Sequence, residues 1–167
     1  GREMTAQNTI RTTQLERLYE LRESLAQTGL AARNAFVFPN DADATRELAI
    51  LDQHKAHYLE ELEALTPLFA GNADFAKMRE GLLQMAQELD RPRRYRAAGQ
   101  MTEYGTFLVN ECSPLRRRNV QDINLVIKDV QNKVEQGTAN AQAAISTAQG
   151  TIVFVTLAAV VLSVLVG

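Results

Sequence analysis

The chain has 167 residues and a formal net charge of −2, so it is one domain in length and has no overall positive charge for binding nucleic acid. Its single cysteine excludes an intrachain disulfide. It has no glycine-rich phosphate loop, nucleophile elbow or paired-carboxylate motif, so we expect no enzyme.

Two long helices are predicted in the N-terminal part of the chain. The first should run from about residue 3 to Phe38, because proline at position 39 disfavours helix in the residue before it. The second should be capped by Asp41 or Asp43 and end near Gly71. Apolar residues at three-to-four spacing should face the core. These are Ile10, Leu15, Leu18, Leu21 or Leu25, Ala32 and Phe36, then Leu48, Leu51, Tyr58, Leu62 and Leu65.

Two further helices are predicted after Gly71. Asn72 is expected to cap the third, which Gly99 ends, and the fourth should start near Thr102. Pro92 and Pro114 fall inside these helices and should bend them locally. The third helix has the core positions Phe75, Met78, Leu82, Met85 and Leu89. The fourth has the seam of a left-handed supercoil at Val120, Ile123, Ile127, Val130, Val134, Gly137, Ala141, Ala144 and Ala148.

The last stretch, residues 151–167 (TIVFVTLAAVVLSVLVG), contains no charged residue. At about 1.5 Å per residue its length is roughly 25 Å, near the lower limit for crossing a hydrocarbon core of about 30 Å. We expect a truncated transmembrane helix here, with a buried core helix as the alternative. No lysine or arginine follows Lys133, which indicates a non-cytoplasmic location for the preceding residues.

The predicted fold is all-α, an antiparallel up-down-up-down four-helix bundle whose fourth helix is continuous with the C-terminal transmembrane helix. Long helices joined by short turns favour this arrangement. Residues 1–150 would form the bundle and residues 151–167 the membrane segment. The turns at Pro39 and Gly99 would then lie at the end far from the membrane.

A basic zone is predicted at this distal end. Residues 91–118 contain seven arginines against two glutamates. A guanidinium group donates two parallel hydrogen bonds to a carboxylate, so the zone favours a site for a small organic anion, the alternative being a solvated or ion-paired surface. The candidate ligand-binding residues are Arg33, Arg91, Arg94, Tyr95, Thr106, Asn110 and Ser113.

The two histidines give no comparable prediction. His54 and His57 lie on nearly one face of the second helix, but nothing nearby in sequence completes a metal shell. Neither histidine has a glutamate three residues before it, as bundle di-iron sites require. We therefore expect no metal and no cofactor.

Several of these features together resemble a known family. The stretch AARNAF (31–36) before the first distal turn, the four antiparallel helices and the fourth helix entering a membrane span are similar to the four-helix-bundle sensor domain of bacterial methyl-accepting chemotaxis proteins. The resemblance implies a homodimer (a higher oligomer stays open) in the bacterial inner membrane, with a periplasmic sensor domain that binds its ligand near the distal end of the dimer interface.

The resemblance also implies roles for particular residues. Arg33 matches the last of the arginines with which the aspartate-sensing members hold carboxylates, whereas the two earlier positions are Ser24 and Gly29. The ligand implied is therefore a di- or tricarboxylate rather than an amino acid. Asn110 and Ser113 lie in the stretch FLVNECSP (107–114), which matches the second contact segment.

Other functions fit parts of the same sequence. A histidine kinase or cyclase can have such a sensor domain. A tail-anchored interaction protein would place the bundle in the cytosol. A nucleic-acid binder would use Arg91–Arg96 and Arg116–Arg118, and its binding would weaken steeply with salt.

Overall fold

The computed structural model describes the backbone of residues 1–166, and the side chains of that range except Met4, Ala141 and residues 147–166. The described residues contain helices and no strand, which confirms the all-α class. The elements are α1 (Arg2–Val37), α2 (Asp41–Leu65), the 3-10 helix η1 (Thr66–Phe69), α3 (Ala73–Glu88), α4 (Arg91–Ala97), α5 (Met101–Phe107), the π-helix η2 (Leu108–Cys112) and α6 (Ser113–Val166).

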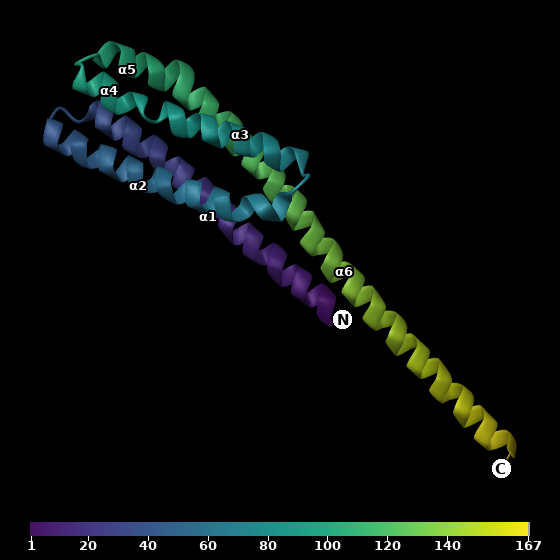
Figure 1. Cartoon of the computed structure of the whole chain (residues 1–167). Coiled ribbons are helices and arrows are strands. Elements are labelled where there is room, and N and C mark those ends of the chain that lie inside the picture. The colour runs from purple at the N-terminus through teal and green to yellow at the C-terminus, as the bar shows by residue number, and fades with distance from the viewer. Residues whose placement is uncertain (167) are drawn as a thin grey trace.

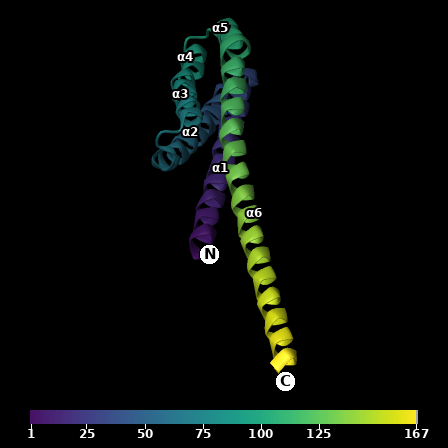
Figure 2. The same cartoon turned by 90° about the vertical axis from the view of Figure 1, so that its right-hand side faces the viewer.

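The helices form a bundle from which α6 continues alone. Helix α1 packs against both α2 and α6, and α3 packs against α6. The loop between α1 and α2 and the loop between α4 and α5 lie at the same end of the bundle, far from the C-terminus (Figure 1). In the second view α6 again runs well past the other helices (Figure 2). We call the end with the two loops the distal end.

The core consists of the apolar faces predicted from the periodicity. All five predicted positions of α3 are buried, and so are most of those in α1 and α2. Leu48 is only half-buried. Ile10 is 54% exposed, so its assignment to the core was wrong. It lies beside Leu68 of η1, where α2 has ended and little remains to cover it.

Two asparagines start helices. Asn40, rather than Asp41 or Asp43, caps α2, because its side chain accepts from the amides of Ala42 and Asp43. Both aspartates instead lie in the first turn of the helix, where a carboxylate also favours the helix dipole. Asn72 caps α3 as predicted, by accepting from the amide of Phe75 at 2.9 Å.

The two internal prolines have different effects. Pro92 lies in the first turn of α4, so it does not bend one long helix. The helix is interrupted at Leu89 and Asp90 and begins again at Arg91. A first-turn amide has no helical partner, so proline loses nothing there. Pro114 is the second residue of α6, one position after Ser113, which follows the π-helix η2 directly, and the chain stays helical through it.

The supercoil seam of α6 is buried only in its upper part. Ile123, Ile127 and Val130 are buried, whereas Val134 is half-buried and Ala144 is exposed. Among the residues whose placement is described, no helix is long and apolar enough to span a membrane. The predicted membrane segment, residues 151–167, lies outside the residues whose side chains are described, as do the seam positions Ala141 and Ala148.

Candidate ligand-binding site

An open groove of about 940 Å³ lies near the distal end, between α1 on one side and α5, η2 and the start of α6 on the other. We call it the distal groove. Its walls are mainly apolar, and two arginines and one serine supply the polar groups. The lining residues are Ala26, Gly29, Leu30, Arg33, Phe36, Val37, Gly105, Leu108, Val109, Ser113 and Arg116.

Tyr104 holds α5 against α1 beside the groove. Its ring is buried, and its hydroxyl donates to the carbonyl oxygen of Ala32 at 2.5 Å. The ring of Phe36 lies 5.1 Å away, centroid to centroid. Burial raises the pKa of Tyr104 above its usual range, although Arg96 opposes the shift. The phenol therefore stays protonated and keeps the contact between the two helices.

The π-helix η2 forms part of the opposite wall. In it the amide of Ser113 donates to the carbonyl of Leu108, five residues back. Pro114 provides a physical reason for this, because a proline has no amide and its ring clashes with the carbonyl four residues earlier. A single π turn absorbs that conflict without ending the helix, and such turns are frequent at functional sites.

Arg116 lies across the face of α1 at the base of the groove. Its guanidinium donates to the carbonyl of Leu25 at 3.4 Å and to the hydroxyl of Thr28 at 3.3 Å. A methyl group on Gly29 would come within 2.7 Å of the guanidinium carbon. The residue at position 29 must therefore be small for Arg116 to lie there.

Arg33 differs from Arg116 because it has no partner among the described residues. Its side chain is exposed on the rim of the groove. Arg33 makes no hydrogen bond or ion pair with any residue that the structure describes. Ser113, half-buried, lines the same groove. Of the seven candidate residues, the structure brings these two together.

Arg91 and Tyr95 belong to a separate cluster. Arg91 donates to Glu88 at 2.7 Å and to Glu111 at 3.0 Å, and its guanidinium lies 4.4 Å from the ring centre of Phe107. The hydrogen bonds that Arg91 donates to Glu111 and, next in effect, to Glu88 raise the pKa of Arg91 above its usual range. The Tyr95 hydroxyl accepts from Arg91 at 3.1 Å. Arg91 is thus engaged within the protein and does not line the groove.

The other three candidates lie on exposed surface. Arg94, Thr106 and Asn110 are exposed, and none of them lines the distal groove. Thr106 directly follows Gly105, which does line it, so one step along a helix is enough to turn a side chain away. The position in the sequence predicts how far along the bundle these residues lie. It does not predict which side of the helix their side chains face.

Much of the basic zone is neutralised by ion pairs. Arg93 pairs with Asp52, and Arg96 pairs with Asp41 at 3.0 Å while also donating to the carbonyl of Ala35 at 2.8 Å. These contacts tie α4 to the start of α2 and the end of α1. Three arginines of the predicted basic zone, Arg91, Arg93 and Arg96, are thus paired within the bundle and do not line the distal groove.

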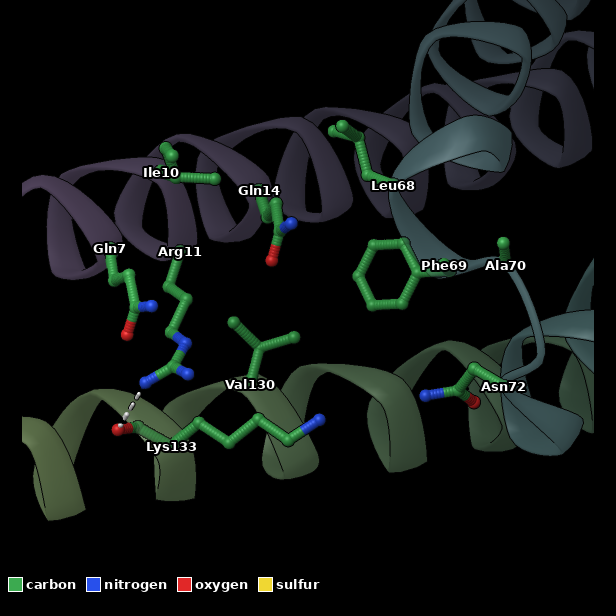
Figure 3. A pocket seen from close by; sticks show the side chains of 10 residues that line it. All are labelled: Gln7, Ile10, Arg11, Gln14, Leu68, Phe69, Ala70, Asn72, Val130 and Lys133. Atoms are coloured by element: carbon green, nitrogen blue, oxygen red, sulfur yellow. Dashed lines mark hydrogen bonds between the residues drawn. The ribbon is translucent and has the colours of Figure 1, made fainter.

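A second cavity of about 350 Å³ lies at the other end of the bundle, between α1, η1 and α6 (Figure 3). Its cationic residues are Arg11 and Lys133, and Phe69 and Val130 form apolar walls. Arg11 donates to the backbone carbonyl of Lys133 at 3.1 Å, the bond drawn in Figure 3. Lys133 pairs with Asp129 at 3.0 Å. Both cations are thus engaged already, unlike Arg33.

No family model, no curated protein and no solved structure matches this chain. The distal groove brings together two of the predicted residues, Arg33 and Ser113, with Arg116. The residue that the sequence did not single out there is Arg116. Gly29 on α1 is the matching feature, because the guanidinium of Arg116 lies where a side chain at position 29 would begin.

Proposed function

We propose that the chain is the periplasmic sensor domain of a bacterial inner-membrane receptor of the chemotaxis-transducer kind, and that the distal groove binds a small organic anion. The observation that carries the proposal is the guanidinium of Arg33, which has no partner in the described part of the chain and lies on the rim of an apolar groove that also contains Ser113 and Arg116. A free guanidinium beside apolar walls is suited to a carboxylate.

The composition of the groove favours a di- or tricarboxylate over an amino acid. Arg33 and Arg116 supply two cationic forks, and Ser113 supplies a hydroxyl donor. None of the described residues that line the groove is an aspartate or glutamate, so nothing there would neutralise an ammonium group. A hydrogen bond to a charged group contributes about 1.5–3 kcal/mol, and two or three such bonds support affinities of roughly micromolar order.

A second copy of the chain would complete the site. Leu30, Val37 and Val109 on the groove walls are 53%, 59% and 70% exposed. Apolar side chains gathered around a groove are typical of a surface that another protein covers. In a homodimer the partner's groove wall would exclude water from the ligand, which strengthens the bonds made by Arg33.

Helix α6 would carry the response. In the proposed receptor the helices alternate in direction, up-down-up-down, and α6 leads from the groove into a transmembrane helix at residues 151–167. A ligand that contacts both α1 and α6 would favour one axial position of α6 relative to α1, because it binds one arrangement better than the other. Residues Ser113 and Arg116 begin α6, so the contact is made directly on the moving element.

The test is a calorimetric titration of the 167-residue chain in detergent with succinate, citrate and aspartate. Citrate or succinate should bind, and Arg33→Ala should weaken that binding by about 1.5–3 kcal/mol, roughly tenfold to more than a hundredfold. Arg94→Ala is the matched control, since Arg94 is also an exposed arginine but does not line the groove. Equal effects of the two variants, or no binding of any anion, would remove the proposed site.

A further inference from the structure

Three metal-ligating side chains meet in the middle of the α1–α2 face. Glu20 of α1 and His57 and Glu61 of α2 each offer one ligand atom, and these atoms all lie within 4.8 Å of one another. His57 and Glu61 are four residues apart on one helix, so they project from the same side. His57 Nε2 lies 3.8 Å from Glu20 Oε2.

The separations are close to those that a bound cation requires. Nitrogen and oxygen ligands lie about 2.0–2.2 Å from a zinc ion, so two ligands on a tetrahedral ion are about 3.5 Å apart. Glu20 and His57 are exposed, and their side chains can rotate by the remaining ångström at little cost. Imidazole together with carboxylates suits zinc and neighbouring transition metals better than calcium or magnesium, which prefer oxygen ligands alone.

Glu61 makes this group different from an ordinary surface cluster. Its side chain is 8% exposed, and burying a carboxylate is costly unless it is well paired. Among the described residues its hydrogen-bond partner is Arg17, through a single bond of 3.3 Å to Oε2. The side chain of Arg17 is half-exposed, so it can move outward. A cation at the cluster would take over the neutralisation of Glu61.

We infer that Glu20, His57 and Glu61 form a binding site for a divalent transition-metal cation of the zinc class, which links α1 to α2. Three protein ligands leave a coordination position for water, so the site is open to exchange with solvent. The two carboxylates and a neutral imidazole balance the charge of the ion. Along the sequence alone, the histidines on α2 lacked a completing ligand. Glu20 supplies it from another helix.

The metal site is separate from the distal groove. Glu20 and Arg33 are both on α1, and at about 1.5 Å per residue they are roughly 20 Å apart along its axis. None of the three ligands lines the groove. Metal binding and anion binding can therefore be tested independently, and a negative result for one proposal does not contradict the other.

The experiment is a titration of the metal-free 167-residue chain, in detergent, with Zn²⁺ alone. We expect one ion per chain, and a rise in the midpoint of thermal unfolding that EDTA reverses. His57→Ala should weaken binding by at least about tenfold, since even the loss of an outer-shell partner of a metal ligand has an effect of that size. His54→Ala removes the other histidine of the chain and should leave the affinity unchanged.

Two further variants keep the proposal testable if His57→Ala folds poorly. Glu20→Gln alters an exposed side chain and should weaken Zn²⁺ binding to a similar extent. Arg17→Ala removes the competitor for Glu61 and should tighten it. With Co²⁺ as the probe, a visible absorption spectrum that disappears in His57→Ala should report the nitrogen ligand. Absence of Zn²⁺ binding, or binding that His57→Ala and Glu20→Gln leave intact, would overturn the inference.

Discussion

Two glycines lie where side chains of α6 come close to neighbouring helices. A methyl group on Gly29 of α1 would lie 2.7 Å from the guanidinium of Arg116, and one on Gly81 of α3 would lie 2.4 Å from the Asn119 side-chain oxygen. Arg116 and Asn119 are one helical turn apart on α6. Each polar side chain thus lies directly over a position without a side chain. The Arg116 side chain is long enough to move aside, whereas the buried Asn119 is not, so the constraint is stronger at Gly81.

The variant Gly81→Ala tests this close packing. Asn119 is 1% exposed and cannot swing into solvent, so the added methyl group forces a shift in the core. We expect a loss of about 1–3 kcal/mol in the free energy of unfolding, the usual range for overpacking, measured by urea denaturation followed by circular dichroism. The double variant Gly81→Ala with Asn119→Ala should recover part of the loss. If Gly81→Ala alone is as stable as the parent chain, then α3 and α6 are less closely packed at this position than the structure indicates.

At the same scale, the sequence identified part of the candidate site. Arg33 and Ser113 were both named from the sequence, and both line the distal groove. Arg91 and Tyr95 were named for their height along the bundle, yet Arg91 donates to both Tyr95 and Glu111 and neither residue lines the groove. Because α4 and α5 have seven residues each, too few for a clear periodicity, their rotation could not be predicted.

Among the elements, the π-helix η2 has the clearest link to the groove. It places Leu108 and Val109 on one wall, and Ser113 follows directly at the start of α6. Its cause is local. In a regular α-helix the ring of Pro114 would clash with the carbonyl of the residue four positions earlier. The sequence indicated a bend at this proline. It did not distinguish a kink from a π turn, because that choice depends on how α5 and α6 pack around it.

The variant Pro114→Ala should separate stability from binding. Alanine restores the missing amide donor, so the segment can become regular α-helix and its side chains rotate relative to α1. We expect an unfolding midpoint that is unchanged or higher, and an affinity for citrate or succinate that falls by about tenfold, equal to about 1.4 kcal/mol. Pro67→Ala, in η1 at the other end of the bundle, is the control. Unaltered binding in Pro114→Ala would show that the π turn does not shape the site.

The helices themselves were largely predictable, and their ends less so. Three-to-four periodicity predicted the large core residues of the third helix well, because all five predicted positions, the last of them the C-cap Leu89, are buried. The break at Asp90 and the cap at Asn40 were missed. In both places several neighbouring residues could end or cap the helix. Packing against the rest of the bundle decides which of them does so.

For the whole molecule, the long helix α6 connects the two ends. At the distal end Ser113 and Arg116 line the groove, and at the other end α6 continues beyond every other helix (Figure 1). Gly137 lies against Asn8 near the start of α1, where an added methyl group would be 2.5 Å from the Asn8 side-chain oxygen. The α1–α6 contact thus extends from the groove toward the start of α1, which is the contact that a sensor would have to alter.

The most direct test of this proposed coupling is a distance measurement by pulsed electron paramagnetic resonance. Spin labels would be attached at Glu60→Cys on α2 and Ser146→Cys on α6, both exposed positions. Cys112 is buried and should stay unlabelled. Saturating citrate or succinate, whichever binds more tightly, should change the distance by about 1–2 Å, the size of helix shifts in receptors and other switches. Arg33→Ala should abolish the change. An unchanged distance in the ligand-bound parent chain, or an equal change in Arg33→Ala, would contradict the proposal that the distal groove controls α6.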